Sequence, residues 1–340
     1  MRQHTLNFLP SELEKFLTGL GEKKYRAKQI PEWICDKLVT DFSKMTSLSK
    51  KSRNLLSGQL DISLPRIIKK EISSDGTIKF LLELQDQSNI EMVLIPFIKK
   101  NTLCVSSQVG CKWNCSFCAT GKMGFKRNLQ MYEIISQILI AKKELKEQKL
   151  TNIVFMGMGE PLDNFLNLER SIRLLQDESC FGFSPRRITV STSGLIPEIR
   201  RLSETGLKVK LAVSLNSAIQ SKRDKLMPVS KVYPLTELKK ALLDFRKKTN
   251  HRITFEYIMI KDVNMGNDDS KALRRFMGDI SGKLNLISWN DVEKLPFESP
   301  SQTEIDSFLQ LLKSIDSVVT FRRSRGQDIG GACGQLAARM

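Results

Sequence analysis

Strand-like and helix-like segments alternate from about residue 101 to the end of the chain. Short apolar runs of the kind that form buried parallel strands recur between amphipathic stretches such as the one with Leu235, Leu238 and Leu242. The predicted strands are Thr102–Val105, Asn152–Phe155, Arg187–Val190, Lys208–Val213, Ile253–Ile260, Leu284–Ile287 and Val318–Phe321. Repeated β–α units predict an α/β fold, and about six of them favour a partial TIM-like (β/α)6 barrel over a Rossmann sheet. Chemistry is then expected at the carboxyl ends of the strands.

The first hundred residues follow two other patterns. Residues 1–65 predict a small helical accessory domain, with Ser11 capping its first helix and Pro31 in the first turn of its second. Residues 66–97 predict a β-hairpin extension around Asp75-Gly76, followed by a third strand on which Glu91 faces inward. Residues 98–340 then form the barrel domain, which ends in a loop around Cys333.

The net charge of +17, from 54 Lys plus Arg against 37 Asp plus Glu, favours a polyanionic partner. Nucleic acid is the first candidate, and the N-terminal domain is expected to contribute to RNA binding. An anionic membrane surface is second, but no basic amphipathic helix supports it. There is no apolar run of the roughly 18–20 residues that a spanning helix needs, and no secretory apolar region. We therefore expect a cytoplasmic protein that does not enter membranes, and no interface signal predicts more than a monomer.

Four of the seven cysteines, at positions 104, 111, 115 and 118, lie within 15 residues. Cys111, Cys115 and Cys118 have C-x3-C-x2-C spacing, which lets one short loop bind three of the four irons of a [4Fe-4S] cluster. The fourth iron stays open and can chelate the amino and carboxylate groups of S-adenosylmethionine. The alternative is a zinc site completed by Cys104 or Cys180, although structural zinc usually takes ligands from two separate knuckles.

Polar residues follow several predicted strands. A glycine at a strand end lets a ligand approach the backbone, and a carboxylate beside it can bind an ammonium group. Each of these positions alone could equally be a turn or a helix cap. Cys333 has only small neighbours, which suits a mobile nucleophile or an ordinary free cysteine. The strand-end candidates are Gly159, Glu160, Ser191, Ser214, Leu215, Asn216 and Asn290.

Together these motifs resemble the RlmN and Cfr family of radical-SAM RNA methyltransferases. The resemblance covers nearly the whole chain and is carried by CVSSQVGC at residues 104–111, GMGEPL at 157–162, STSG at 191–194 and ACGQL at 332–336. It implies a radical-SAM barrel that uses a [4Fe-4S] cluster and two molecules of S-adenosylmethionine per turnover. The implied partners are 23S rRNA, tRNA as a second substrate, and a flavodoxin-like or ferredoxin-like electron donor.

The resemblance also implies residue roles. Cys333 would take a methyl group from one S-adenosylmethionine, and a 5′-deoxyadenosyl radical from the second would abstract a hydrogen from that methyl. The carbon radical would add to an adenine ring, Cys104 would release the product through a transient disulfide with Cys333, and Glu91 would accept a proton. The seven strand-end candidates match the family's S-adenosylmethionine contacts, namely Gly159, Glu160, Ser191, Ser214, Leu215, Asn216 and Asn290.

Pro161 in Gly-Glu-Pro-Leu is similar to the RlmN type, which methylates adenine C2, whereas Cfr enzymes methylate C8 and tend to have alanine there. Three departures from the family pattern stand out: Asn216 in place of His, Ser288 in place of Pro, and Gly330-Gly331 in place of Asp-Ala. The last would loosen the Cys333 loop. The other readings are a different radical-SAM activity, such as sulfur insertion into RNA, for which no second cluster motif is present, and a zinc-stabilised RNA-binding protein.

Overall fold

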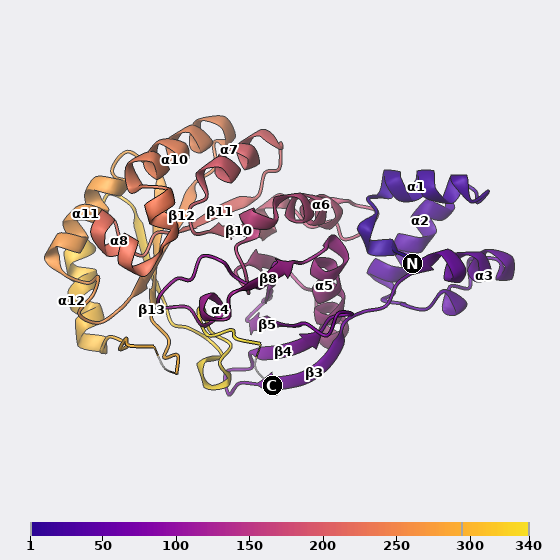
Figure 1. The fold of residues 1–340 in the computed structure, drawn as a ribbon, viewed down its shortest axis with the longest axis horizontal. Coiled ribbons are helices and arrows are strands. Elements are labelled where there is room, and N and C mark those ends of the chain that lie inside the picture. Colours follow the sequence, from indigo (N-terminus) through magenta and orange to yellow (C-terminus); the bar gives the residue numbers. More distant parts are fainter. Residues whose placement is uncertain (1, 294, 339–340) are drawn as a thin grey trace.

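The computed structural model describes residues 2–293 and 295–338 and is built on one ten-stranded sheet. The spatial order of its strands is β14-β13-β12-β11-β10-β9-β6-β5-β4-β3. The sheet curves into a partial barrel with helices on its outside (Figure 1). This confirms the predicted α/β fold.

Seven neighbouring strands of this sheet are parallel, and they are the seven predicted from the apolar runs. Their ends differ from the predicted ends by at most two residues. The strands are β6 (Lys100–Cys104), β9 (Asn152–Phe155), β10 (Ile188–Thr192), β11 (Lys210–Ser214), β12 (Ile253–Met259), β13 (Gly282–Ser288) and β14 (Val318–Arg322).

Three antiparallel strands, β3 (Arg66–Ile72), β4 (Ile78–Glu83) and β5 (Asn89–Phe97), extend the sheet beyond β6. The predicted hairpin forms around Asp75-Gly76, where Gly76 has a φ of +83°, a conformation that glycine adopts without strain. The third strand, β5, also forms as predicted. Glu91 on β5 is buried, which confirms that it faces inward.

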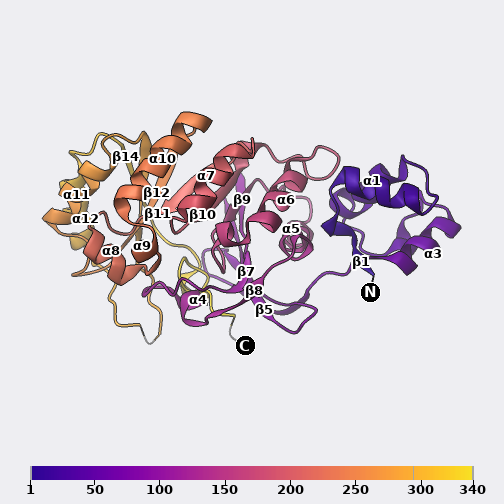
Figure 2. The same ribbon diagram turned by 45° about the horizontal axis from the view of Figure 1, so that its top comes forward.

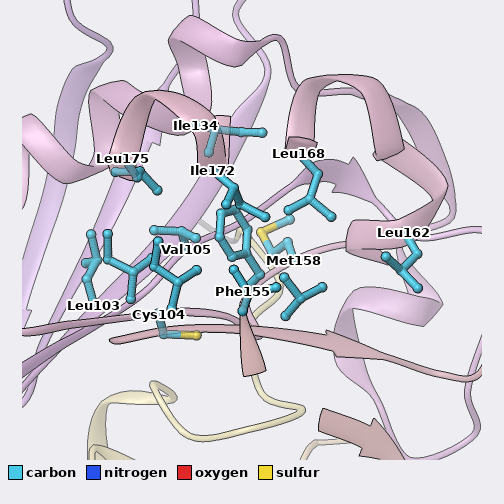
Figure 3. Packing of buried hydrophobic residues seen from close by; sticks show 14 of the residues in the cluster. Leu103, Cys104, Val105, Ile134, Phe155, Met158, Leu162, Leu168, Ile172 and Leu175 are labelled. Carbon is cyan, nitrogen blue, oxygen red and sulfur yellow. The ribbon is translucent and has the colours of Figure 1, made fainter. Parts of the chain in front are cut away.

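The outer face of the parallel strands packs against helices, and this is where the barrel core lies. Phe155 of β9 packs among Ile134 of α5 (Met131–Leu145) and Leu168 and Ile172 of α6 (Phe165–Gln176) (Figure 3). Further along the sheet, Phe255 of β12 contacts a phenylalanine of α11 edge to face. The remaining barrel helices are α4 (Ala119–Lys122), α7 (Ile196–Glu204), α8 (Gln220–Leu226), α9 (Val229–Val232), α10 (Leu235–Thr249), α11 (Asn267–Met277) and α12 (Gln302–Leu312).

The inner face of the strands is more accessible than the outer face. In β12, Phe255 and Tyr257 face the helices and are fully buried, whereas Thr254, Glu256 and Ile258 alternate with them and are only partly buried. Because alternate residues of a strand point to opposite faces, these three face the barrel interior. The inner face of β12 is therefore less tightly packed than its outer face.

Residues 2–62 form a separate helical lobe at one end of the molecule (Figure 2). Its elements are β1 (Gln3–His4), α1 (Pro10–Gly19), α2 (Arg26–Pro31), a π-helical turn (Glu32–Asp36), a short 3-10 helix (Phe42–Lys44), α3 (Lys50–Gln59) and β2 (Leu60–Asp61). The lobe is tied to the barrel by an ion pair of 2.6 Å between Glu12 and Arg170 and by stacking of His4 on Tyr132.

Two predictions about this lobe were wrong. Leu9, not Ser11, is the N-cap of α1, and the carboxylate of Glu12, the third residue of the helix, accepts the Leu9 backbone N–H. Pro31 does not lie in a first turn, since it ends α2 and leads into the π-helical turn. That turn accommodates the missing proline N–H, which an uninterrupted α-helix cannot.

Across residues 2–293 and 295–338, no helix has both the length and the apolar character that a membrane span requires.

Candidate functional site

The three motif cysteines lie on a loop between β7 (Gln108–Gly110) and α4. The loop is closed by the Cys111 N–H, which donates to the Gly124 carbonyl at 2.8 Å, and by pairing of β7 with β8 (Phe125–Asn128). Gly110 has a φ of +77°, and a Cβ there would lie 1.8 Å from the Gly124 oxygen. Only glycine fits at this position without a clash. Residues 105–110, which include β7, separate the cysteine loop from the end of β6.

The three thiols of this loop are close to one another. Burial raises the pKa of Cys115 well above its ordinary value, and negative charge on Cys118 and Cys111 raises it further. Burial likewise raises the pKa of Cys111, to about 12. In the described residues, no three Cys, His, Asp or Glu side chains are grouped as the ligands of a single metal ion are. A [4Fe-4S] cluster distributes its thiolates over different irons, so the three neighbouring cysteines fit it without converging on one point.

Neither cysteine proposed to complete a zinc site contacts this loop. Cys180 is buried and hydrogen-bonds with Cys35 of the N-terminal lobe, and both line one small apolar cavity with Leu13 and Leu174. Cys104 is buried at the end of β6, and the nearest ionisable group that affects its pKa is Cys333. The fourth ligand that a structural zinc site needs is therefore not supplied by either residue.

Gly159 and Glu160 follow β9 and turn the chain toward the cysteine loop. Gly159 has a φ of +99°, and a Cβ there would lie 2.5 Å from the Cβ of Gln108. The buried Glu160 carboxylate accepts the backbone N–H of Ser193 at 2.7 Å and that of Leu162 at 3.1 Å. Burial raises the pKa of Glu160 to about 7. No lysine or arginine of residues 2–293 and 295–338 forms an ion pair with it, so it is available to an ammonium group.

The other strand-end candidates fall into two groups. Ser191 near the end of β10 and Ser214 at the end of β11 are partly accessible, and Ser191 faces away from the buried residues of its strand. Leu215 and Asn216 are buried. The Asn216 side chain accepts the N–H of Ile258 at 2.9 Å and donates to the Met227 sulfur, so it ties β11 to β12.

The segment that follows β14 carries Cys333 to the cysteine loop (Figure 1). The Gly334 carbonyl accepts the N–H of Ala119 at 2.8 Å, and the Leu336 carbonyl accepts the Thr120 hydroxyl at 2.6 Å. Ala119 is the residue directly after Cys118. These two contacts place Cys333 beside the loop on which the motif cysteines lie.

Cys104 and Cys333 are close enough for charge on one to affect the other. The Cys104 sulfur points away from the core residues Phe155 and Ile172 and toward the C-terminal segment (Figure 3). Burial raises the pKa of Cys104 strongly, and charge on Cys333 raises it further. Cys333 is exposed as a whole residue, whereas the protein atoms packed around its thiol desolvate it. This desolvation, followed by the charges of Glu256 and Cys118, raises the pKa of the thiol to about 11.

Two further candidates hold the Cys333 segment in place. Glu91 accepts the N–H groups of Ala337 and Ala338 at 2.8 and 3.1 Å, and its other oxygen lies 3.5 Å from the Lys79 ammonium. The Asn290 amide donates to the Cys333 carbonyl at 3.0 Å. Both residues are buried, and both contact the C-terminal segment within five residues of Cys333.

Several residues at the site have no signal in the sequence. Arg223 lies in the run Lys222-Arg223-Asp224-Lys225, which predicts a solvated helix face, yet its side chain is fully buried. Asp328 holds the C-terminal segment to the β3–β4 turn by accepting the Ser73 hydroxyl at 2.6 Å. Such contacts join residues far apart in the chain, and only an alignment or a structure could have found them.

The comparisons with known proteins agree over the whole chain. The domain family "Ribosomal RNA large subunit methyltransferase N-terminal domain" matches residues 4–62, and "Radical SAM superfamily" matches residues 105–272. A crystal structure of a radical SAM methyltransferase from Sphaerobacter thermophilus superposes with a TM-score of 0.96 at 40% identity, over 99% of this chain and 100% of that one. The fold and the cysteine loop together define a radical-SAM protein.

Two relatives identify the family within the radical-SAM class. Dual-specificity RNA methyltransferase RlmN of Lawsonia intracellularis is 45% identical over 97% of this chain and 95% of its own length. The protein of the same name from Nitratidesulfovibrio vulgaris is 44% identical over 98% of this chain and 94% of its own. The chain therefore belongs to the RlmN family of radical-SAM RNA methyltransferases.

Proposed function

We propose that this protein methylates C2 of an adenosine in 23S rRNA, and of an adenosine in tRNA, through a methyl group carried on Cys333. The observation that carries the proposal is the docking of the C-terminal segment on the cysteine loop. This docking supports the proposal because it brings Cys333 close to the loop of Cys111, Cys115 and Cys118, more than 200 residues earlier in the sequence.

In this proposal Cys111, Cys115 and Cys118 hold a [4Fe-4S] cluster, which supplies the electron that splits S-adenosylmethionine. Glu160 binds the amino group of S-adenosylmethionine, because it is a buried carboxylate near Cys111 without a cationic partner in the described residues. Gly159 lets the ligand approach the backbone. Ser191, Ser214 and Leu215 line the neighbouring strand ends, while Asn216 and Asn290 act by fixing a strand end and the Cys333 backbone.

The two other thiols have complementary roles. Cys333 is accessible and can receive a methyl group, whereas Cys104 is buried at the end of β6 with its sulfur toward the C-terminal segment. Burial supports a role for Cys104 as the thiol that would attack an adduct on Cys333, because it shields Cys104 from other thiols. Glu91, the proposed proton acceptor, lies at the anchor of the same segment, where its carboxylate now binds two backbone N–H groups.

A surface next to the cysteine loop supports an RNA substrate. The turn between α4 and β8 exposes Met123 and Phe125, which are 42% and 45% exposed, together with Lys122 and Lys126. Cations bind phosphates, and an exposed aromatic ring can stack on an unpaired base. The overall charge of +17 adds to this attraction.

The position of the methyl group can be tested in a strain that lacks this gene, with the wild-type chain restored from a plasmid. Nucleosides from purified 23S rRNA and from tRNA are separated and identified by mass spectrometry. We expect 2-methyladenosine in both RNAs only when the chain is present. Methyl on C8 with none on C2 would assign the Cfr type of activity, and an unmodified tRNA pool would restrict the substrate to rRNA.

A further inference from the structure

Helix α8 is hydrogen-bonded to the middle of the cysteine loop. Both the backbone N–H and the hydroxyl of Ser116 donate to the carbonyl of Leu226 at the end of α8, at 2.9 and 3.2 Å. Ser116 directly follows Cys115. Leu226 lies three residues after Arg223, and residues with this spacing share one side of a helix. Arg223, in the middle of α8, therefore lies about one turn from the helix end that binds the loop.

Arg223 is fully buried and makes only neutral contacts. Its guanidinium donates to the carbonyls of Ser193 at 2.6 Å, Leu215 at 3.1 Å and Ser214 at 3.2 Å. These carbonyls lie at the ends of β10 and β11. In the described part of the chain, no carboxylate forms an ion pair with this guanidinium, whereas most buried charges in proteins have an ionic partner.

The charge that could balance this guanidinium lies on the cysteine loop, because α8 contacts that loop through Leu226 and Ser116, about one helical turn beyond Arg223. Burial lowers the pKa of Arg223 to about 10, as expected for a buried cation that has no carboxylate partner in the described residues. Three thiolates gathered on one loop would supply the negative charge that this cation lacks.

We propose that Arg223 is a positioning residue whose buried charge stabilises the reduced form of the cluster held by Cys111, Cys115 and Cys118. This inference rests on the proposed function, because it requires the cluster. Reduction adds one negative charge to the cluster, and a fixed cation in a low-dielectric surrounding favours the more negative state. Arg223 would thereby make electron transfer to the cluster more favourable before any chemistry on RNA begins.

The test compares Arg223→Gln and Arg223→Lys with the wild type as anaerobically reconstituted full-length proteins, by EPR-monitored redox titration without S-adenosylmethionine. We expect Arg223→Gln to bind the wild-type amount of iron but to be about tenfold harder to reduce, a midpoint about 59 mV more negative for a one-electron couple. Arg223→Lys keeps the charge and should stay near the wild-type midpoint. Arg170→Gln, which removes a hydrogen-bonded arginine at the N-terminal lobe, should leave the midpoint unchanged.

Three results would overturn the inference. The first is an unchanged midpoint in Arg223→Gln with full iron content, and the second is a fall in Arg223→Lys as large as in Arg223→Gln. The third is weaker binding of S-adenosylmethionine with no change of midpoint, which would make the ligand's carboxylate the partner of Arg223. If Arg223→Gln does not load iron, the test rests on Arg223→Lys. A midpoint potential near that of the wild type would support a role for the positive charge, and a clearly more negative one would contradict it. A wild type without any cluster would instead refute the proposed function.

Discussion

The Cys333→Ala variant is expected to lose all detectable methyl transfer, a fall of at least about 10⁴-fold, while it keeps the wild-type amount of iron. The reason is that, in the proposed mechanism, Cys333 would carry the methyl group but would not be one of the three cluster ligands. The measurement is transfer of isotope-labelled methyl from S-adenosylmethionine to an RNA transcript, with iron determined on the same preparation. Mass spectrometry of the wild-type protein should also find a methyl group on the peptide that contains Cys333.

Cys180→Ala is the matched control for this experiment. Cys180 is also a free cysteine, but it is buried against Cys35, away from the cysteine loop. It should transfer methyl groups at close to the wild-type rate. Undiminished transfer by Cys333→Ala would show that the methyl group does not pass through this thiol, and the proposed mechanism would have to be abandoned.

The Cys104→Ala variant is expected to accumulate RNA that is covalently linked to the protein. Without a second thiol opposite Cys333, the adduct between the carried carbon and the adenine has no route to release, so turnover stops after about one adduct per chain. The linked species should appear as a shifted band on a denaturing gel that ribonuclease removes. Peptide mapping should place the attached nucleotide on Cys333.

The double variant Cys104→Ala with Cys333→Ala controls for nonspecific cross-linking and should form no adduct. Free, fully methylated RNA from Cys104→Ala would exclude the resolving role. In that case the position of the Cys104 sulfur, which points toward the C-terminal segment in Figure 3, would have only a packing function.

The barrel could be predicted from the sequence because most of its strands are buried on their outer face by helices. The alternation of Phe255 and Tyr257 with Thr254 and Glu256 is set by this burial, so the strands are visible as apolar runs. The cysteine loop could also be predicted, because its three cysteines are close together in the sequence and lie on one loop. Both features depend on residues that are close together in the chain.

The remaining features depend on contacts between distant residues. Ser11 is a good capping residue by type, but the carboxylate of Glu12 already satisfies the N–H of Leu9. Asn216, which replaces the usual histidine, holds β12 through the N–H of Ile258. The burial of Arg223 depends on three carbonyls from two other segments, and no local pattern indicates it.

The two glycines before Cys333 illustrate the same point. Gly330 has a φ of +61°, and the Gly331 N–H donates to the Gly326 carbonyl at 2.8 Å. Asp328 ties the same segment to Ser73. The segment is thus fixed by contacts on both sides of the glycines, which compensate for the backbone freedom that two successive glycines add.

The most direct test of a three-cysteine cluster site is a determination of iron and sulfide, with EPR after reduction, on anaerobically reconstituted wild type, Cys115→Ala and Cys180→Ala. Our account predicts about four irons per chain in wild type and Cys180→Ala, an EPR signal that changes when S-adenosylmethionine is added, and loss of most iron in Cys115→Ala. Stoichiometric zinc in place of iron, or a cluster signal that does not respond to S-adenosylmethionine, would contradict it.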